Sequence, residues 1–593
     1  EYPNADVLII SEKISLTMMP DGRVEESRFR AEKVLTYQGI DTIGDPKVAF
    51  DTVNQKLSID KCATFSPDGR VTEAKKNSFT EMTPFELERS PDYTTIRQMV
   101  VTKVGMELGS VVEFGYTVSD IKPWRKCLQG VLLLQSEYPA ILKEITIKVP
   151  EGTTLKFAGE VVMNSSKEPG FTVYRATLKD LSALNFHEFG NREEYLNPCL
   201  VFSTATDWSS QASHIYGLVR EAAGKRSKAL EEKAKQLTEK KLTERDKALA
   251  VHDFVTTKMG HVEWSMADFD YSPRNAGRIF ETSYGHKLDM AVLFCAMLES
   301  IGIKAEPWLV MNGRFGNEVA RIPSLALFDD VMATVAADGE TLYLSSTAPA
   351  SEASLRDWSG SRALKIAPGV SAPAVLPGSS TENAVRCAFF LEPKEKAVMK
   401  GTGSVVLTGG YVNYESARNG IEGEIVPFVE GVLPDAGDIK VVAKKISGEE
   451  LSAEVEFTLD LAGAAGKTGF AAVLMTGLPD ASIVNANHFA GREKRSFPMV
   501  LKMKGKESYE IAMRFPDGYP KEANRLPAFS DQSSPIRTSQ SFSIGDGKVS
   551  VNYTVSAEDL VVEPGNYGRA RQAALSLLTI PARMLILEEA KKK

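Results

Sequence analysis

The residues with the clearest chemical meaning lie between Ser283 and Leu298, in the stretch SYGHKLDMAVLFCAML. A short loop containing a glycine runs directly into an apolar segment with the length of a helix. A thiol at the start of such a helix is a strong nucleophile, because the exposed backbone amides and the helix dipole stabilise its thiolate. Here the first helical position holds Lys287, and the nearby thiol, Cys295, lies about two turns further along.

Neither residue is well suited to be a nucleophile. A lysine at a helix start lies in an unfavourable field, and its free amine would form only if burial or a second cation destabilised the charge. The spacing of Cys295 from Ala291 and Leu298 indicates a thiol in the core, which is a common place for free cysteine. His286 could donate a hydrogen bond to a ligand, although a lone loop histidine is more often solvated.

The elements around this stretch predict an α+β unit. Helical periodicity and capping signals predict helices over residues 207–224, 227–241, 242–259, 273–281 and 289–301. Strand patterns follow at residues 305–311, 330–337 and 340–346, and an Asp-Gly turn at 338–339 joins the last two into a hairpin. Helices that precede an antiparallel hairpin are typical of the α+β class.

The flanking regions are rich in strands. Residues 1–205 contain long alternating segments, and the turn sequence PDGRV occurs twice, at 20–24 and 67–71, as expected of hairpins. We therefore predict four parts: an N-terminal antiparallel β-sandwich (1–205), a central α+β core (206–368), a linker rich in Pro, Gly and Ser (369–384), and a C-terminal domain (385–593) that is β-rich and sandwich-like.

This order of elements resembles envelope proteins that carry a transglutaminase-like core, similar to papain-like cysteine peptidases, between two β-domains. In that family Gly-Asp-Cys-Lys-Asp enters a helix, Phe-Asn-His-Val lies in a strand, and Leu-Asp-Pro-Thr ends the next strand. The Cys, His and Asp form the catalytic triad. This sequence has GHKLD at 285–289, FDDV at 328–331 and LSST at 344–347.

The resemblance places Lys287, Asp330 and Ser345 at the Cys, His and Asp positions of the triad. It therefore implies a degenerate triad with no catalytic residue, in which Asp330 forms a salt bridge with Lys287 and Ser345 can only form hydrogen bonds. A facing carboxylate favours the charged form of an amine, which argues further against amine chemistry. The candidate ligand-binding residues are His286, Lys287, Asp330 and Trp264.

The predicted function is that of a catalytically inactive transglutaminase-like protein. It would bind a peptide, protein or glycan, or act as a scaffold, in the bacterial cell envelope. One alternative is an active cysteine peptidase or transamidase with its nucleophile elsewhere, which requires a Cys and a His within hydrogen-bonding reach in a cleft. Another is a structural or adhesion module in which the β-domains carry the interaction.

Composition excludes several other classes. A chain of 593 residues with 25% charged residues and a net charge of −8 lacks the basic character of nucleic-acid binders. The five cysteines have no metal-ligand spacing, and one disulfide would leave an odd thiol. The acidic pairs Asp268/Asp270 and Asp329/Asp330 lack a calcium-loop pattern, so neither a metal nor a cofactor is expected.

The sequence also carries expectations about location. No apolar run approaches the roughly 20 residues of a transmembrane helix. The chain begins at Glu1 without a methionine, which favours a removed leader and a secreted, periplasmic or outer-membrane-associated protein in bacteria.

Overall fold

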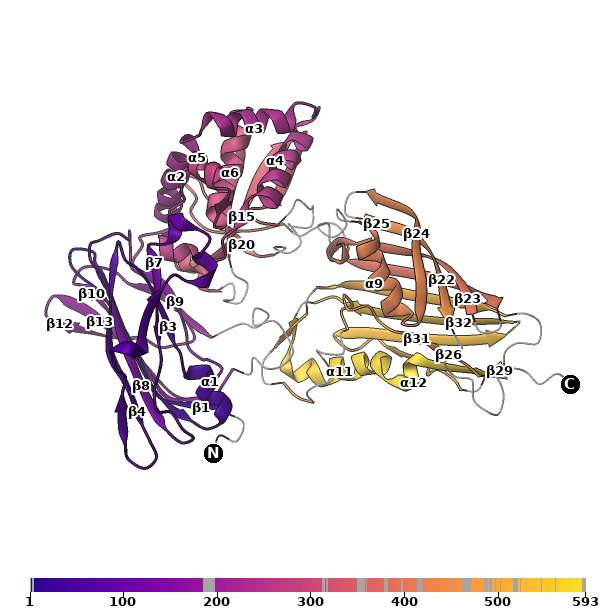
Figure 1. The fold of residues 1–593 in the computed structure, drawn as a ribbon, viewed down its shortest axis with the longest axis horizontal. Coiled ribbons are helices and arrows are strands. Elements are labelled where there is room, and N and C mark those ends of the chain that lie inside the picture. Colours follow the sequence, from indigo (N-terminus) through magenta and orange to yellow (C-terminus); the bar gives the residue numbers. More distant parts are fainter. Residues whose placement is uncertain are drawn as a thin grey trace. The chain divides into compact units, whose positions relative to one another are not determined.

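The structure is a computed structural model, shown in Figure 1. It describes residues 2, 5–184, 198–311, 315, 318–348, 358, 360–377, 382–395, 398–412, 420–447, 450–460, 471–484, 489, 493–495, 498–501, 503–515, 521–522, 524–545, 547–559 and 561–588. No helix in these residues is long and apolar enough to cross a membrane.

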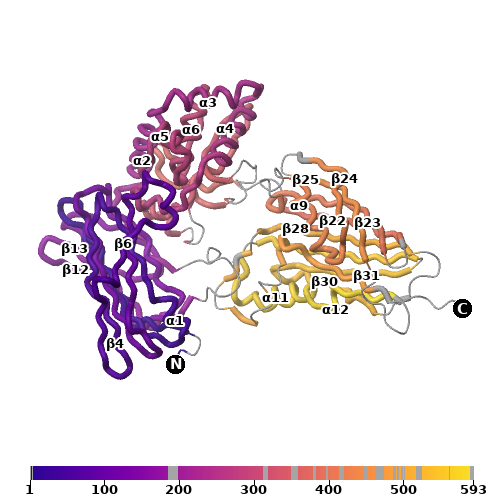
Figure 2. Tube along the Cα trace, viewed as in Figure 1, coloured from indigo at the N-terminus to yellow at the C-terminus, as the bar shows by residue number. Residues whose placement is uncertain are grey.

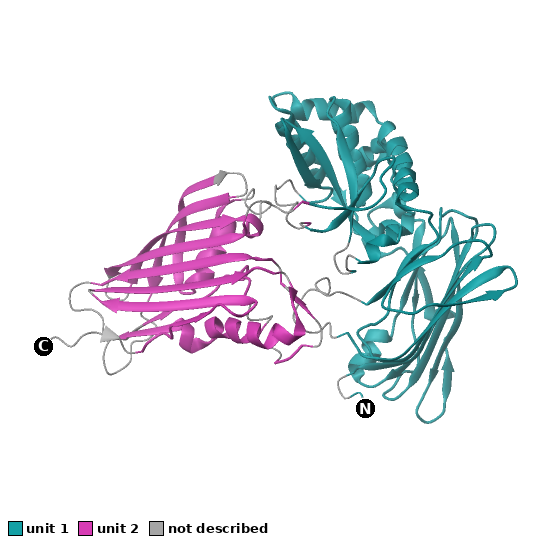
Figure 3. Ribbon diagram, turned by 180° about the vertical axis from the view of Figure 1, so that it is seen from behind, with its two compact units in different colours: residues 1–185, 196–348, 360–376 teal, residues 186–195, 349–359, 377–593 magenta. Residues whose placement is uncertain are grey.

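The chain forms a multidomain α+β protein with two compact units (Figures 2 and 3). Residues 1–185, 196–348 and 360–376 form the first unit, which holds both the N-terminal sheets and the helical core. Residues 186–195, 349–359 and 377–593 form the second.

The first unit begins with a large sheet in the order β12-β13-β10-β1-β2-β8-β4-β5. Its strands are β1 (Val7–Met18), β2 (Val24–Val34), β4 (Gln55–Phe65), β5 (Val71–Glu73), β8 (Val111–Asp120), β10 (Ala140–Pro150), β12 (Asn164–Glu168) and β13 (Phe171–Leu181). Strands β1 and β10 pair in parallel, so the sheet is mixed and not antiparallel throughout as predicted. The sequence concealed this pair, because a parallel pair needs a long crossover and leaves no turn signal.

Two small sheets form a second layer on one face of the large sheet. They are β11-β14-β9 and β3-β7-β6, with β3 (Lys47–Asp51), β6 (Phe79–Met82), β7 (Ile96–Val101), β9 (Gln129–Leu133), β11 (Lys156–Gly159) and β14 (Cys199–Ser203). Leu200 and Phe202 pack with Ile145 and Ile147 of the large sheet. A short helix, α1 (Tyr37–Ile43), lies between β2 and β3.

Both PDGRV sequences are hairpin turns, as predicted. Gly22 and Gly69 take φ values of +91° and +88°, which glycine adopts without steric cost. The carboxylates of Asp21 and Asp68 each accept a hydrogen bond from the Nε of the arginine two residues on, at 2.8 and 2.6 Å. The repeated motif is therefore a turn device.

The core consists of helices around a five-stranded sheet in the order β19-β18-β17-β20-β21. The elements are α2 (Trp208–Gly224), α3 (Lys228–Thr238), α4 (Glu244–Lys258), α5 (Ala276–Thr282), α6 (Lys287–Ser300), β17 (Ala305–Met311), β18 (Phe328–Ala337), β19 (Glu340–Ser345), β20 (Arg362–Lys365) and β21 (Ala374–Val375). Every residue of α6 from Leu288 to Leu298 is buried, as expected of a helix that is apolar all round.

The predicted linker at 369–384 is only partly a connection. Ala374 pairs with Ala363 of β20, and Leu376 is 3% exposed, so these residues complete the edge of the core sheet. The composition signal was correct for loops, but two residues suffice for an edge strand.

The second unit has one large sheet in the order β24-β25-β23-β22-β28-β32-β31-β30 and two small ones, β26-β34-β29 and β27-β33. The strands are β22 (Ala384–Glu395), β23 (Val398–Thr408), β24 (Ala436–Ser447), β25 (Glu450–Asp460), β26 (Ala471–Met475), β27 (Met499–Val500), β28 (Gly505–Arg514), β29 (Lys521–Glu522), β30 (Phe529–Asp531), β31 (Ile536–Gly545), β32 (Lys548–Ala557), β33 (Val561–Val562) and β34 (Met584–Glu588).

Helices take much of the place that a second sheet would have in a sandwich. They are α9 (Glu422–Val432), α11 (Pro564–Leu578) and α12 (Ile580–Arg583), and the first two share a core with the large sheet. The sequence predicts this region as β-rich. Helix α9 was not predicted, because Pro427 inside it reads as a helix breaker.

A buried carboxylate organises the second unit. Glu507 on β28 is 2% exposed and accepts hydrogen bonds from the hydroxyls of Tyr411, Ser482 and Tyr509 and from the backbone N–H of Ile483. Burial raises the pKa of Glu507, while these four donors lower it. The four donors share this one carboxylate.

We expect Glu507→Ala to lower the stability of the second unit by at least about 3 kcal/mol, because several buried donors lose their acceptor together. Glu507→Gln should cost less, since its carbonyl still accepts. The measurement is the midpoint of denaturant unfolding. Glu510→Ala on the exposed face of the same strand is the control, expected within about 0.5 kcal/mol of wild type, and equal effects at the two positions would contradict this reading.

Candidate functional site

The start of α6 is fixed by two residues that precede and follow Lys287. His286 is the N-cap, and its Nδ1 accepts a hydrogen bond from the backbone N–H of Asp289 at 3.4 Å. The His286 ring stacks on Phe269 with 5.2 Å between ring centroids. Its side chain is 1% exposed, so the loop histidine proposed as a ligand donor lies inside the domain.

Asp289 is the centre of a buried network. Its carboxylate, which is fully buried, accepts hydrogen bonds from the Arg274 backbone N–H at 2.8 Å, from Arg274 Nε at 2.7 Å, and from the Tyr93 hydroxyl. That hydroxyl also accepts from the His286 backbone N–H at 3.1 Å. Burial and the Asp289 charge raise the pKa of Tyr93, so the phenol remains a donor.

Tyr93 belongs to the N-terminal β-region, so this network joins two parts of the first unit. Next to it, Asp92 accepts from Arg274 at 2.6 Å and from Arg278 at 2.7 Å. Hydrogen bonds from Arg278 and Arg274 outweigh partial burial and lower the pKa of Asp92 to about 2. The polar contacts surround an apolar cluster formed by Leu87, Tyr93, Ile96 and Val262.

The predicted pair between the first two triad positions is present. Lys287 Nζ lies 3.7 Å from Asp330 Oδ1 and donates to the Asp329 carbonyl oxygen at 3.0 Å. The two side chains are 25% and 29% exposed, so solvent reaches the pair, and we call this part of the surface the Lys287 site. Such a pair offsets the unfavourable position of the lysine at the helix start.

Ser345 lies on the neighbouring strand. It is the β-sheet partner of Met332, two residues from Asp330, so strand alternation puts Asp330 and Ser345 on one face about 7–8 Å apart. The Ser345 hydroxyl accepts from the backbone N–H groups of Thr347 and Ala348, at 3.3 and 3.1 Å. The structure thus pairs Lys287 with Asp330, while Ser345 holds the turn after β19.

A histidine that was not selected from the sequence also lies near the Lys287 site. His261 is on the short strand β15 (Gly260–His261), which pairs in parallel with β16 (Tyr284–Gly285) directly before α6. Burial lowers the pKa of His261, and the charge of Lys287 lowers it further, while Glu263 and Asp330 act in the opposite direction. The sequence signal is the extended pattern GHVEW at 260–264, which lacks the His-Glu-x-x-His spacing of a zinc-binding helix.

Trp264, the fourth candidate, packs against the apolar cluster of Leu87, Tyr93, Ile96 and Val262. Its indole lies close enough to Asp268 to lower the pKa of that carboxyl, which burial raises. Trp264 therefore belongs to the junction of the N-terminal region with the core.

All five cysteines are free thiols. Burial raises the pKa of each of them: to about 11 for Cys127 and Cys199, to about 12 for Cys295, and upward for Cys62 and Cys387. Cys295 is 7% exposed, in agreement with its predicted place in the core. Raised pKa values are the opposite of what an activated nucleophile requires.

Within the described residues, no group of three or more His, Cys, Asp or Glu side chains is arranged to hold a metal ion.

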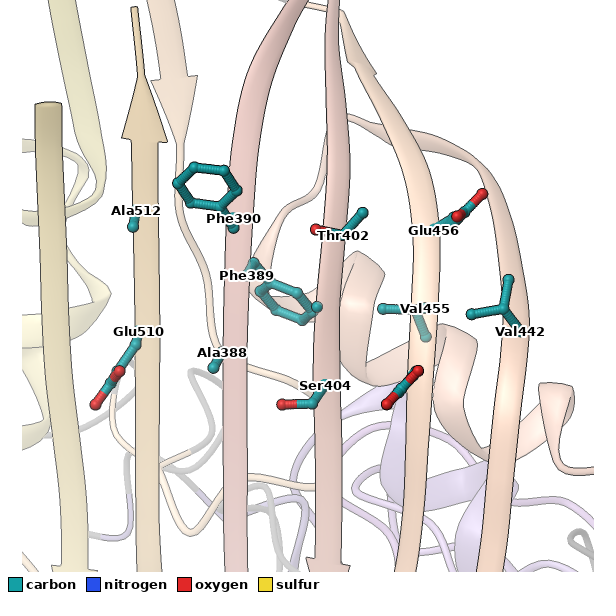
Figure 4. A pocket seen from close by; sticks show the side chains of 12 residues that line it. Ala388, Phe389, Phe390, Thr402, Ser404, Val442, Val455, Glu456, Glu510 and Ala512 are labelled. Atoms are coloured by element: carbon teal, nitrogen blue, oxygen red, sulfur yellow. The ribbon is translucent and has the colours of Figure 1, made fainter. Parts of the chain in front are cut away.

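A hollow of about 510 Å³ lies on the large sheet of the second unit. Figure 4 shows two rows of side chains across its strands, Ala512-Phe390-Thr402-Glu456 and Glu510-Ala388-Ser404, in agreement with the strand register. The register continues the second row to Glu454, which pairs with Ser404.

The comparison with protein families agrees with this geometry. Residues 231–312, which run from within α3 to the end of β17, match the model of the transglutaminase-like superfamily. The central domain is transglutaminase-like. Residues 20–185 match a domain of unknown function, DUF3857. The transglutaminase-like match covers Lys287 but ends before Asp330 and Ser345.

Solved structures support the fold of the whole chain. A crystal structure from Parabacteroides distasonis, described as "a putative protease", is similar over 98% of this chain and 99% of that chain, with 18% identity and a TM-score of 0.73. Aminopeptidase A of Legionella pneumophila (10% identity, 34% of this chain and 22% of that chain) and an M1 zinc metallopeptidase of Deinococcus radiodurans (9% identity, 33% and 42%) reach TM-scores of only 0.19 and carry no argument. No curated protein matches the sequence.

We expect Asp289→Ala to destabilise the first unit by about 3–5 kcal/mol, because it leaves the buried Arg274 guanidinium with only one of its two carboxylate partners, Asp92. Thermal and denaturant unfolding of the full chain measure the loss. Arg278→Gln, which breaks an exposed ion pair with Asp92, is the control and should cost under about 1 kcal/mol. If Asp289→Ala costs no more than that control, the network does not hold the site.

His286 gives a prediction about pH. Burial lowers the pKa of His286 in the folded protein, so below about pH 6.5 the unfolded chain binds more protons than the folded chain. The stability of the folded state therefore decreases as the pH is lowered. His286→Asn keeps a good N-cap without a titrating ring. Unfolding measured between pH 7 and 5 should show a shallower loss for this variant, and an unchanged slope would contradict the assignment.

Proposed function

We propose that the transglutaminase-like core is catalytically inactive and that the Lys287 site binds a peptide, protein or glycan in the bacterial cell envelope. The observation that carries the proposal is the Lys287–Asp330 pair, which occupies the positions aligned with the nucleophile and the base. A lysine held by a carboxylate and a carbonyl oxygen is a hydrogen-bond donor and not a nucleophile.

The Lys287 site offers polar groups suited to recognition. Lys287 and Asp330 are partly exposed, and His261 and Glu263 lie beside them with 3.2 Å between Nδ1 and Oε2. These groups supply donors and acceptors of both signs at the start of a rigid helix. A segment of peptide or glycan backbone presents the same mixture of donors and acceptors, so it complements this surface without a strong net charge.

A scaffold role is a second candidate, favoured by the Asp289 network. Tyr93 of the N-terminal region inserts its hydroxyl into the start of α6, so the core also acts as a clamp for that region. If the core is only a scaffold, the Lys287 site has no ligand and its partly exposed ion pair binds nothing.

The first arm of the test concerns activity. We expect the full-length wild type to show neither thiol-dependent casein hydrolysis nor transamidation. The triple variant K287C, D330H, S345D restores the family residues and serves as the positive control for alignment of the site. Activity in the wild type that is lost in Cys295→Ala would overturn the proposal in favour of an active cysteine enzyme.

The second arm concerns binding. Arrays of short peptides and soluble glycans are probed with the full chain, and the double variant K287A, D330A should lose at least about tenfold in affinity for any ligand found. The double variant K225A, E221A, which removes an exposed ion pair of α2 in the same domain, should bind as wild type does. Equal binding by both double variants, or none by the wild type, would favour the scaffold role.

A further inference from the structure

The inner face of the N-terminal sheet carries charges where a sandwich normally has apolar side chains. Glu12 on β1 and Glu32 on β2 point into the space between the layers, with 7% and 4% of their side chains exposed. Lys103 and Lys143 accompany them at 2% and 6% exposure. Fully buried charges are rare unless each is paired, so the balance of this group is informative.

The buried charges are paired but not balanced. Arg30 donates to Glu12 at 2.6 Å and lies 3.4 Å from Glu32, Lys143 lies 2.9 Å from Glu12, and Lys103 lies 2.6 Å from Glu32. Although burial would raise the pKa of Glu12, Arg30 and Lys143 lower it to about 2, so this carboxylate is ionised. Burial lowers the pKa of Lys143, although the charge of Glu12 opposes this shift. Counting Arg30, whose side chain is 36% exposed, three cations face two carboxylates, and one positive charge remains.

A cavity of about 290 Å³ adjoins this network. Its lining includes Arg28 and Arg30, and its apolar and aromatic lining residues are Ile43, Val48, Phe114, Tyr116 and Tyr138. Lys47 and Glu137 also line the cavity and have opposite charges. The network residues Glu12, Glu32 and Lys103 line the cavity as well, so its wall combines charged groups of both signs with apolar and aromatic side chains.

Arg28 supplies an available donor group. Its Nε donates to Glu26 at 2.5 Å, and this is the bond that holds its guanidinium among the described residues. The two terminal amino groups have the fork geometry that pairs with a planar anion through two parallel hydrogen bonds. Because Glu26 balances Arg28, the excess charge of the buried network is still uncompensated.

We propose that this cavity binds a small monoanionic carboxylate with an apolar body, whose carboxylate is held by Arg28 and Arg30. A single negative charge balances the network, whereas a doubly charged phosphate would reverse the imbalance. The volume lies at the lower end of ligand pockets, which limits the bound part to about the size of one amino-acid residue. The carboxylate is that of a free small acid or the C-terminus of a peptide.

This inference does not depend on the proposed function. All residues that line the cavity lie between Glu12 and Tyr138 in the N-terminal region, and none of them belongs to the Lys287 site. Failure at either site therefore leaves the other unaffected, provided that each set of variants is measured separately.

Isothermal titration of the full chain tests the proposal with three probes: N-acetyl-L-leucine, its neutral amide, and the acetylated tripeptide acetyl-Ala-Ala-Leu with a free carboxylate. We expect the acid to bind at least tenfold more tightly than the amide. Binding of the tripeptide as well identifies a peptide C-terminus as the source, and binding of the acid alone identifies a free small acid. No binding of either acid, or equal binding of the amide, overturns the proposal.

Variants of the two faces of the sheet provide the matched control. Arg28→Gln should weaken binding of the acid at least tenfold, and Arg28→Lys, which keeps the charge without the fork, should weaken it less. Arg175→Gln changes an arginine on β13 that pairs with Glu168 on the opposite, outer face, and should bind as wild type does. Circular dichroism and the melting temperature confirm folding, and loss of binding in Arg175→Gln equal to that in Arg28→Gln would contradict the site.

Discussion

The buried Asp289 carboxylate is the constraint on which the first unit depends. An ionised carboxylate without exposure is too costly to keep unless its oxygens are satisfied, and here Arg274 and Tyr93 satisfy them. These contacts fix where α6 begins, because the same tyrosine receives the N–H of the N-cap residue. They also tie the N-terminal region to the core, so one residue sets both the position of the helix and the junction beside it.

The position at which α6 begins determines what chemistry the Lys287 site could perform. The dipole of α6 would stabilise a thiolate at its first position, but Lys287 occupies that position, and its ammonium group lies near Asp330 and donates to the Asp329 carbonyl. The pair is neutral as a whole and its members already have partners. A nucleophile must instead be deprotonated, either by an adjacent base or through a lowered pKa. Burial raises the pKa of the nearby Cys295, so this thiol does not meet that requirement.

Local features of the sequence could be predicted and contacts over long distances could not. The two Asp-Gly turns, the N-cap Thr243 of α4 and the apolar run of α6 each depend on residues within a few positions of one another. The Tyr93–Asp289 bond joins residues 196 positions apart, and no periodicity reports it. Strand β2 reads as polar, VEESRFRAEKV, so nothing local revealed that Arg30 and Glu32 lie under a second layer.

The residues that hold the frame are distinct from those at the triad positions. At Gly285 a Cβ atom would lie 2.7 Å from the Cβ of Asp289, so this close approach requires glycine, and Asp289 requires Arg274 in turn. Lys287, Asp330 and Ser345 have no comparable role, because their contacts are a partly exposed pair and a turn. The three letters can therefore change while the fold is kept. For the same reason, the likeness to a solved structure over the whole chain at 18% identity describes the frame and does not transfer an activity.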